Sequence, residues 1–200
     1  MEQQDVHTFQ LDTVQDVIEV DEIGEVAKHI LTHLSVSESF NSLGFDSVGD
    51  LIYLIGQSKN DILSSLYLHS YRGIGTAKAP VESGKLASTV MDLINQELIA
   101  SANSVGEGGL FVALVRASIF NTLGFSIKTD PSFRKDAFLF GESSERVVVS
   151  VKSDNQLDFE EALSAQHIPA KFLGVVSKGK MAIDSEKIMD VTEAKTLLGV

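Results

Sequence analysis

The sequence predicts an α+β fold, a sandwich of a mixed sheet with helices. Short apolar runs bounded by glycines indicate buried strands, and longer stretches carry apolar residues at helical spacing. These two kinds of segment alternate irregularly and a hairpin comes late, which argues against a regularly wound parallel sheet. Hydrophobic residues make up 44% of the 200 residues, which is enough for a sizeable core.

The first predicted element is an amphipathic helix over Asp21–Leu34. Its apolar residues recur at helical spacing, and acidic residues gather near its start, where the helix dipole favours them. We predict that this helix belongs to an acidic N-terminal extension, residues 1–40, and that residues 41–200 form one domain. Asp50–Ile55 has the sequence DLIYLI between two glycines, which is typical of a buried strand.

The middle of the chain is predicted to contain two helices and two strands. Lys85–Asn103 has the apolar spacing of a long amphipathic helix, and Leu110–Phe120 that of a more buried helix after a glycine-rich turn. Phe125–Lys128 is a short strand candidate. Arg146–Val151 is rich in β-branched residues, which predicts another strand.

The last third is predicted to hold a helix, a hairpin and a closing helix. The helix spans Gln156–Gln166. Phe172–Val176 and Met181–Ile183 are expected to pair as a hairpin around Lys178-Gly179-Lys180. Thr192–Leu198 is expected to form a short helix at the end.

The composition excludes several classes of chemistry. The chain has no cysteine, so disulfides, thiolate catalysis and zinc–thiolate sites are ruled out. Its formal net charge is −12, which gives no general attraction for nucleic acid or anionic lipid. The acidic N-terminus is unlike a signal peptide, and no apolar run has membrane-spanning length. We therefore expect a cytoplasmic protein without nucleic-acid or membrane partners.

The first candidate site is the glycine-rich stretch Val105–Leu114, VGEGGLFVAL. Glycines before a helix can expose several backbone N–H groups to a phosphate. The alternative, common for short glycine clusters, is a tight turn that allows close helix packing. The Gly-Lys-Ser/Thr ending of a phosphate-binding P-loop is missing.

The second candidate is Glu142 and Ser143 followed by Arg146, just before a buried strand. These groups could hold a polar ligand or a metal-bound phosphate at the sheet edge. Equally, Glu142 and Arg146 could form an internal salt bridge that orients a loop. His29 and His33 have the i, i+4 spacing of metal ligands, but no third ligand is evident, so surface or partly buried histidines are the more common explanation. We predict no catalytic residue and no metal site.

Four segments, in order, resemble one known family. They are GDLIYLIG (Gly49–Gly56), SANSVGEGGLFVAL (Ser101–Leu114), FGESSERVVVSV (Phe140–Val151) and KFLGVVSKGKMAI (Lys171–Ile183). Together they are similar to the second C-terminal-type domain of phosphoribosylformylglycinamidine synthase, within the wider superfamily of aminoimidazole ribonucleotide synthetase C-terminal domains. The resemblance implies that superfamily's fold.

The resemblance also implies a function for the intact enzyme. That enzyme is an ATP-dependent C–N ligase of purine biosynthesis, which uses magnesium and glutamine-derived ammonia to convert formylglycinamide ribonucleotide to the amidine. Its nucleotide and metal residues lie mostly in a different type of domain, whose motifs are absent from this sequence. This chain is therefore expected to be mainly scaffold and interface, to be inactive alone and without its own cofactor, and to pair with a missing ATP-binding domain or with a second copy.

The family pattern gives a set of phosphate-side ligand candidates, and this chain departs from the pattern nearby. The candidates are Gly106, Glu107, Gly108, Gly109, Glu142, Ser143 and Arg146. Asn103-Ser104 stands where the family has His-Asp, so the most obvious carboxylate of the site is lost. Gly106 replaces a family serine, and Leu63–Tyr67 replaces the family's GGSEY segment.

Two other hypotheses compete with this interpretation. The chain could be a stand-alone, degenerate binding module that kept the fold and lost catalysis, which would account for the substituted positions. It could also be a relative of selenophosphate synthetase or of hydrogenase maturation proteins, but the wording FGES-x-x-R argues against that.

Overall fold

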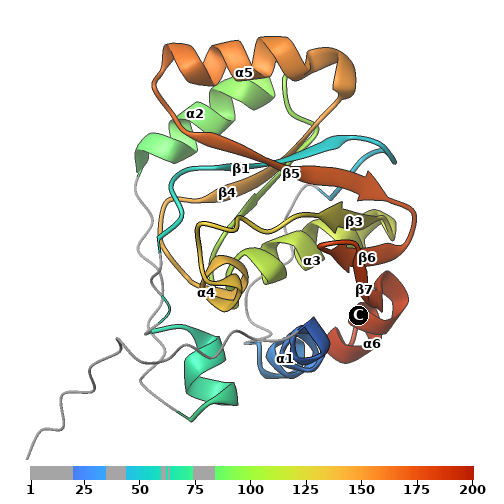
Figure 1. The fold of residues 1–200 in the computed structure, drawn as a ribbon. Coiled ribbons are helices and arrows are strands. Elements are labelled where there is room, and N and C mark those ends of the chain that lie inside the picture. Colours follow the sequence, from blue (N-terminus) through green and yellow to red (C-terminus); the bar gives the residue numbers. More distant parts are fainter. Residues whose placement is uncertain (1–19, 35–43, 60–61, 63, 74–83) are drawn as a thin grey trace, which may run out of the picture.

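A computed structural model describes residues 20–34, 44–59, 62, 64–73 and 84–200 (Figure 1). Within these ranges the strands form one seven-stranded sheet in the order β2-β4-β1-β5-β3-β6-β7. Every pairing is antiparallel except β3 with β6, so the sheet is mixed, as predicted. The strands are β1 (Leu51–Ile55), β2 (Ser101–Ser104), β3 (Gly124–Ile127), β4 (Val147–Val151), β5 (Ala170–Ser177), β6 (Lys180–Ile183) and β7 (Glu186–Asp190).

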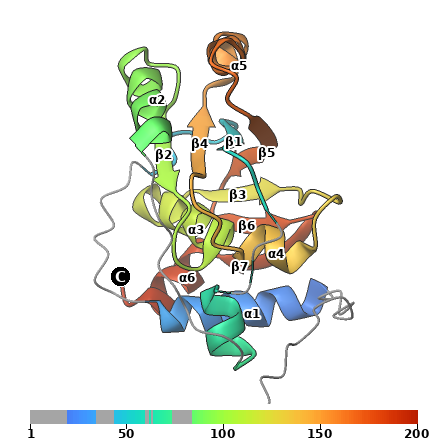
Figure 2. The same cartoon turned by 90° about the vertical axis from the view of Figure 1, so that its left-hand side faces the viewer.

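Helices cover both faces of the sheet, which confirms the predicted sandwich. Figures 1 and 2 show α2 and α5 on one face, α3 and α4 on the other, and α1 and α6 beyond α3. The helices are α1 (Val20–His33), α2 (Gly84–Asn95), α3 (Gly109–Asn121), α4 (Lys135–Phe140), α5 (Gln156–Ala165) and α6 (Val191–Leu198). None of these described helices is long and apolar enough to cross a membrane.

Strand β1 lies between two hydrophobic clusters, and this position explains why its sequence is apolar throughout. Ile52 and Leu54 point into the cluster that contains α3, whereas Tyr53 and Ile55 point into the cluster beneath α2 and α5. Because both faces are covered, alternation of apolar and polar residues is not needed. Burying one such side chain contributes about 1.5–3 kcal/mol.

Helix α1 packs into the main core. Five of its apolar side chains are almost fully buried in the same cluster as α3 and β1: Ile23, Val26, Ala27, Ile30 and Leu31. The predicted helix is therefore present, and its apolar face contacts the domain. The proposed boundary after residue 40 lies outside the described residues and stays a prediction.

The predicted hairpin between β5 and β6 is wrong. Strand β3 lies between them, with Phe125 opposite Val176 of β5 and Met181 of β6. Gly124 permits this insertion, because a Cβ atom there would lie 1.9 Å from the carbonyl oxygen of Lys180. The true hairpin joins β6 to β7 through Asp184 and Ser185, whose φ angles are +53° and +74°. Two consecutive positive φ angles are typical of a tight two-residue hairpin turn.

The long helix predicted over Lys85–Asn103 is also wrong at its C-terminal end. Helix α2 ends at Asn95, and Ser101–Ser104 forms β2, an edge strand paired with β4. The helix ends because Glu97 has a left-handed backbone with φ +56°, and the N–H of Leu98 donates to the carbonyl of Leu93. Glycine usually occupies such a position, so the sequence gives no obvious stop signal.

Candidate functional site

The glycine-rich turn lies where the start of α3 meets the end of α4. Gly108 and Gly109 have φ angles of +77° and +73°, in the left-handed region that glycine adopts at little cost. A Cβ atom on Gly109 would lie 2.7 Å from the carbonyl oxygens of Leu139 and Gly141, and one on Gly108 would lie 2.3 Å from Val112. The glycines thus allow two backbone segments to touch, which is the packing role considered from the sequence.

Glu142 reaches this turn with its carboxylate. Its Oε1 atom accepts the N–H of Gly108 at 2.9 Å and the N–H of Leu66 at 2.8 Å. Burial raises the pKa of Glu142, although the two N–H donors and the charge of Arg146 act to lower it, and Glu107 adds to the rise. One carboxylate therefore connects three segments that are far apart in the sequence.

Arg146 holds the loop that carries Glu142. Its side chain is only 1% exposed, and its Nη2 and Nε atoms donate to the carbonyls of Gly141 (2.6 Å) and Ser143 (3.2 Å). Its own carbonyl accepts the N–H of Val105, at the beginning of the glycine-rich turn. Both Glu142 and Arg146 thus bond backbone groups, an arrangement that can orient the loop, and their loop-orienting role stays a prediction.

Ser143 is buried beside these two side chains. Its Oγ atom has no hydrogen-bond partner within the described part of the chain. The sequence candidates around Gly106–Gly109 and Glu142–Arg146 are thus brought together, but mainly by contacts among themselves. Whether a phosphate also binds there stays a prediction.

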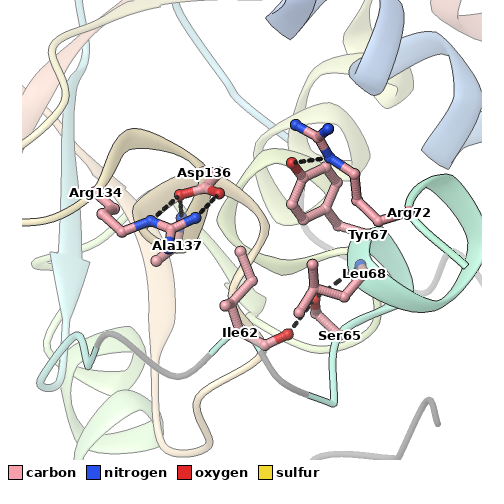
Figure 3. A network of polar contacts seen from close by, with 8 residues as sticks. All are labelled: Ile62, Ser65, Tyr67, Leu68, Arg72, Arg134, Asp136 and Ala137. Atoms are coloured by element: carbon pink, nitrogen blue, oxygen red, sulfur yellow. Dashed lines mark hydrogen bonds and ion pairs between the residues drawn. The ribbon is translucent and has the colours of Figure 1, made fainter. Parts of the chain in front are cut away.

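Residues 64–73, for which the sequence indicated no role, contact this site through Leu66. Figure 3 shows Ser65 Oγ donating to the carbonyl of Ile62 at 2.7 Å and accepting the N–H of Leu68 at 3.3 Å. Arg72 Nε donates to the Tyr67 hydroxyl at 3.1 Å, and its guanidinium lies 5.7–5.9 Å from the rings of Tyr67 and Tyr71. Burial raises the pKa of Tyr67, against the lowering effect of Arg72.

An ion pair at the beginning of α4 completes the arrangement in Figure 3. Arg134 binds the Asp136 carboxylate with two bonds, at 3.1 Å and 2.5 Å, and Asp136 also accepts the N–H of Ala137 at 2.8 Å. An aspartate in the first turn of a helix is a normal stabilising feature. Asp136 is the second residue of the short helix α4, and an acidic residue at this place is the sequence signal that could have revealed the ion pair.

The histidine pair contains no complete metal site. The rings of His29 and His33 stack with their centroids 4.0 Å apart, and His33 Nδ1 bonds the carbonyl of His29 at 2.8 Å. No group of three or more potential metal ligands occurs among the residues that the structure describes. The candidate site, which comprises the glycine-rich turn, the Glu142–Arg146 loop and residues 64–73, is a polar network suited to hold loops in place.

Curated relatives of the chain share one name. "Phosphoribosylformylglycinamidine synthase subunit PurL" from Alkaliphilus metalliredigens is 33% identical over 140 residues, covering 68% of this chain and 19% of the relative. The subunit from Thermoanaerobacter sp. (strain X514) is 31% identical over 156 residues, covering 75% of this chain and 21% of the relative. The chain thus spans about a fifth of the length of these relatives.

Solved structures share the fold at low sequence identity. "T. maritima PurL complexed with FGAR" superimposes with a TM-score of 0.61 at 16% identity, over 78% of this chain and 29% of that one. "T. maritima PurL complexed with ATP" gives 0.57 at 14% identity, over 76% and 26% of the two chains. A chain of the "HypE-HypF complex" gives 0.51 at 17% identity, over 70% and 51%.

A family model decides the assignment. The model described as "AIR synthase related protein, C-terminal domain" matches residues 47–184, which is more than half of the chain. All four segments that carried the sequence resemblance touch this range, and the fold agrees with it. The chain therefore belongs to the family of AIR synthase related proteins, through their C-terminal domain.

Proposed function

We propose that the chain is the C-terminal-type domain of a phosphoribosylformylglycinamidine synthase of de novo purine biosynthesis, with a scaffold and interface role. In the intact enzyme, ATP and magnesium would drive amidine formation from formylglycinamide ribonucleotide. The names of the curated relatives support the enzyme, and the share of their length that the chain spans supports one domain of several.

One contact carries the scaffold role. The N–H of Gly108, which would suit a phosphate oxygen, is already bonded to Glu142. The position of the family's aspartate is Ser104, an exposed residue on the edge strand β2, so no carboxylate is offered there for a metal. A phosphate bound at the Gly108 N–H would require Glu142 to move away first, and the phosphate-side role of Gly106–Gly109, Glu142, Ser143 and Arg146 stays a prediction.

An activity assay tests the proposal. The purified chain, given formylglycinamide ribonucleotide, ATP, magnesium and ammonia, should form no amidine. Mixed or co-expressed with the remaining part of a PurL relative that lacks the corresponding domain, it should restore turnover. Clear turnover by the chain alone, or no complex with the remaining part, would contradict the proposal.

A stand-alone binding module of the same fold is the second candidate. The substituted positions Asn103, Ser104 and Gly106 favour it, as does the burial of α1 in the main core. The reading frame decides between them, because an ATP-binding domain encoded upstream in the same frame would eliminate the stand-alone module.

We further propose that the protein is cytoplasmic and forms a homodimer when alone; a monomer in light scattering would exclude the dimer.

A further inference from the structure

We propose that two copies of the chain pack through the face of the sheet that carries α5. Each copy lays the outer side of its α5 over the uncovered strands β5, β3 and β6 of the other copy. The proposal names the surfaces of the homodimer proposed above, and it rests on that homodimer rather than on the assignment to the purine enzyme.

The described helices cover only part of this face of the sheet. The hydrophobic cluster beneath α2 and α5 is built on β4 and β1, and no described residue of β5, β3, β6 or β7 belongs to it. On β5, Phe172 lies opposite Tyr53 of β1 and Val175 lies opposite Leu51, so both point to this same face. Phe172 is 51% exposed and Val175 is 37% exposed, although both are apolar. An apolar surface is thus left open beside α5.

The strand register shows what the open surface presents. Ser126 of β3 lies opposite Val175 of β5 on one side and Ala182 of β6 on the other. Residues paired in this way share one face of a sheet, so a strip of small side chains crosses the three strands. Strands β5 and β6 are two strand spacings apart, or about 10 Å. That width is close to the diameter of one helix, about 10–12 Å.

Two lysines border this strip of small side chains. Met181 and Ile127 are buried in the main core, so their neighbours Lys180 and Lys128 point to the open face. Both lysines are exposed, and neither takes part in an ion pair with any residue that the structure describes. The formal net charge of the chain is −12, so a basic border around an apolar strip stands out. Such a surface is complementary to an acidic helix that carries an apolar side chain.

The outer side of α5 has this chemistry. Phe159 is buried against the sheet, and Leu157 and Glu161 lie on the opposite side of the helix, where Leu157 is 66% exposed. Asp158 is exposed as well, and neither acid has an ion-pair partner in the described ranges. One leucine with two free carboxylates matches a strip of small side chains between two lysines.

The two surfaces lie side by side, so one two-fold axis can satisfy both. Figures 1 and 2 show α5 above β5. A groove of about 640 Å³ separates them and is lined by Tyr53, Glu160, Leu163 and Phe172, among others. When two copies face each other, the α5 of one copy lies beside the α5 of the other and over its open strands. Each contact then occurs twice, as in any interface formed by the same surface of two subunits.

Sedimentation equilibrium of two charge-reversed variants tests the proposal on the whole chain. The sheet variant is Lys128→Glu/Lys180→Glu, and the helix variant is Asp158→Lys/Glu161→Lys. Each variant alone brings like charges together at both contacts, so its dimer should dissociate at least about tenfold more readily than the natural dimer. An equimolar mixture places opposite charges at both contacts, so heterodimers should form about as tightly as the natural dimer.

The helix variant is the sharper of the two, because it reduces the net negative charge of the chain and should nevertheless weaken the dimer. Glu25→Lys/Glu193→Lys makes the same change of charge on α1 and α6 and should not weaken it. A natural chain that stays monomeric overturns both the homodimer and these surfaces. A dimer that either variant leaves unchanged, or that mixing does not restore, overturns these surfaces alone.

Cross-linking gives a second measurement that does not depend on charge. The chain has no cysteine, so Ser126→Cys and Leu157→Cys each introduce a single thiol. When the two variants are mixed, one of them isotope-labelled, a short bis-maleimide should join residue 126 of one copy to residue 157 of the other. Thr192→Cys, at an exposed position of α6, should give no such product with Leu157→Cys. Equal yields from the two mixtures would overturn the proposal.

Discussion

Gly109→Ala is the sharpest test of why glycines precede α3. Alanine at φ +73° adopts a left-handed backbone, which costs about 1–2 kcal/mol. Its Cβ atom would also lie 2.7 Å from the carbonyl oxygens of Leu139 and Gly141, and backbone atoms cannot swing aside as a side chain can. Such overpacking adds about 1–3 kcal/mol, so the free energy of unfolding should fall by about 2–5 kcal/mol.

Urea unfolding at one temperature measures this loss, and Gly179→Ala is the matched control. Gly179 has nearly the same backbone, φ +71°, but no atom lies within 4 Å of the added methyl group. The control should therefore lose only the left-handed cost, about 1–2 kcal/mol. Equal losses in the two variants would refute the packing explanation and would favour a turn kept open for a ligand.

Three other predictions follow from buried polar groups. Ser143→Ala removes a buried hydroxyl that has no partner among the described residues, so urea unfolding should show no loss of stability and a gain of up to about 1 kcal/mol; a clear loss would mean that the hydroxyl has a partner. Burial and the hydrogen bond to Glu160 raise the pKa of the Tyr53 hydroxyl from 10.0 to about 12. The stability that this hydroxyl contributes should therefore be lost as pH rises from 10.0 to about 12, and Tyr53→Phe should not show this loss; ultraviolet titration of the phenol checks the pKa. Burial raises the pKa of Glu142 above its ordinary 4.5, so the folded state holds this proton more tightly than the unfolded state. The natural chain should therefore lose stability relative to Glu142→Gln as pH rises from 4.5 through the raised pKa; a difference between the two urea midpoints that does not change with pH would contradict this.

The strongest local patterns in the sequence were sufficient to predict their elements. The run over Leu51–Ile55, the β-branched run over Val147–Val151 and the helical spacing of α1 and α3 all match the structure. Each is a segment whose burial is dictated by its own composition. The order of the four family-like segments was also sufficient to identify the family; they are Gly49–Gly56, Ser101–Leu114, Phe140–Val151 and Lys171–Ile183.

Tertiary neighbours explain what the sequence did not predict. The prediction of a hairpin between β5 and β6 was wrong because β3 lies between these two strands. The sequences of β5 and β6 contain no signal for a third strand between them. The end of α2 was missed because Glu97 takes the left-handed position that glycine usually fills. The edge strand β2, with sequence SANS, has too few apolar residues to produce a strand pattern.

The same reasoning explains the candidate site. The sequence placed Glu142 and Arg146 at one loop and left open a polar ligand, a metal-bound phosphate or a mutual salt bridge. The structure adds hydrogen bonds to backbone groups, with N–H donors for Glu142 and carbonyl acceptors for Arg146. Every residue has such groups, so no residue type in the sequence marks them.

Calorimetric titration of the isolated chain with magnesium and ATP distinguishes a scaffold domain, whose glycine-rich turn is filled by Glu142, from a nucleotide-binding domain. A scaffold should give no saturable heat at millimolar nucleotide, for the natural chain and for Glu142→Gln alike. A saturable heat with a stoichiometry near one, reduced by Gly109→Ala, would show a nucleotide site at the turn and would rule out the scaffold role.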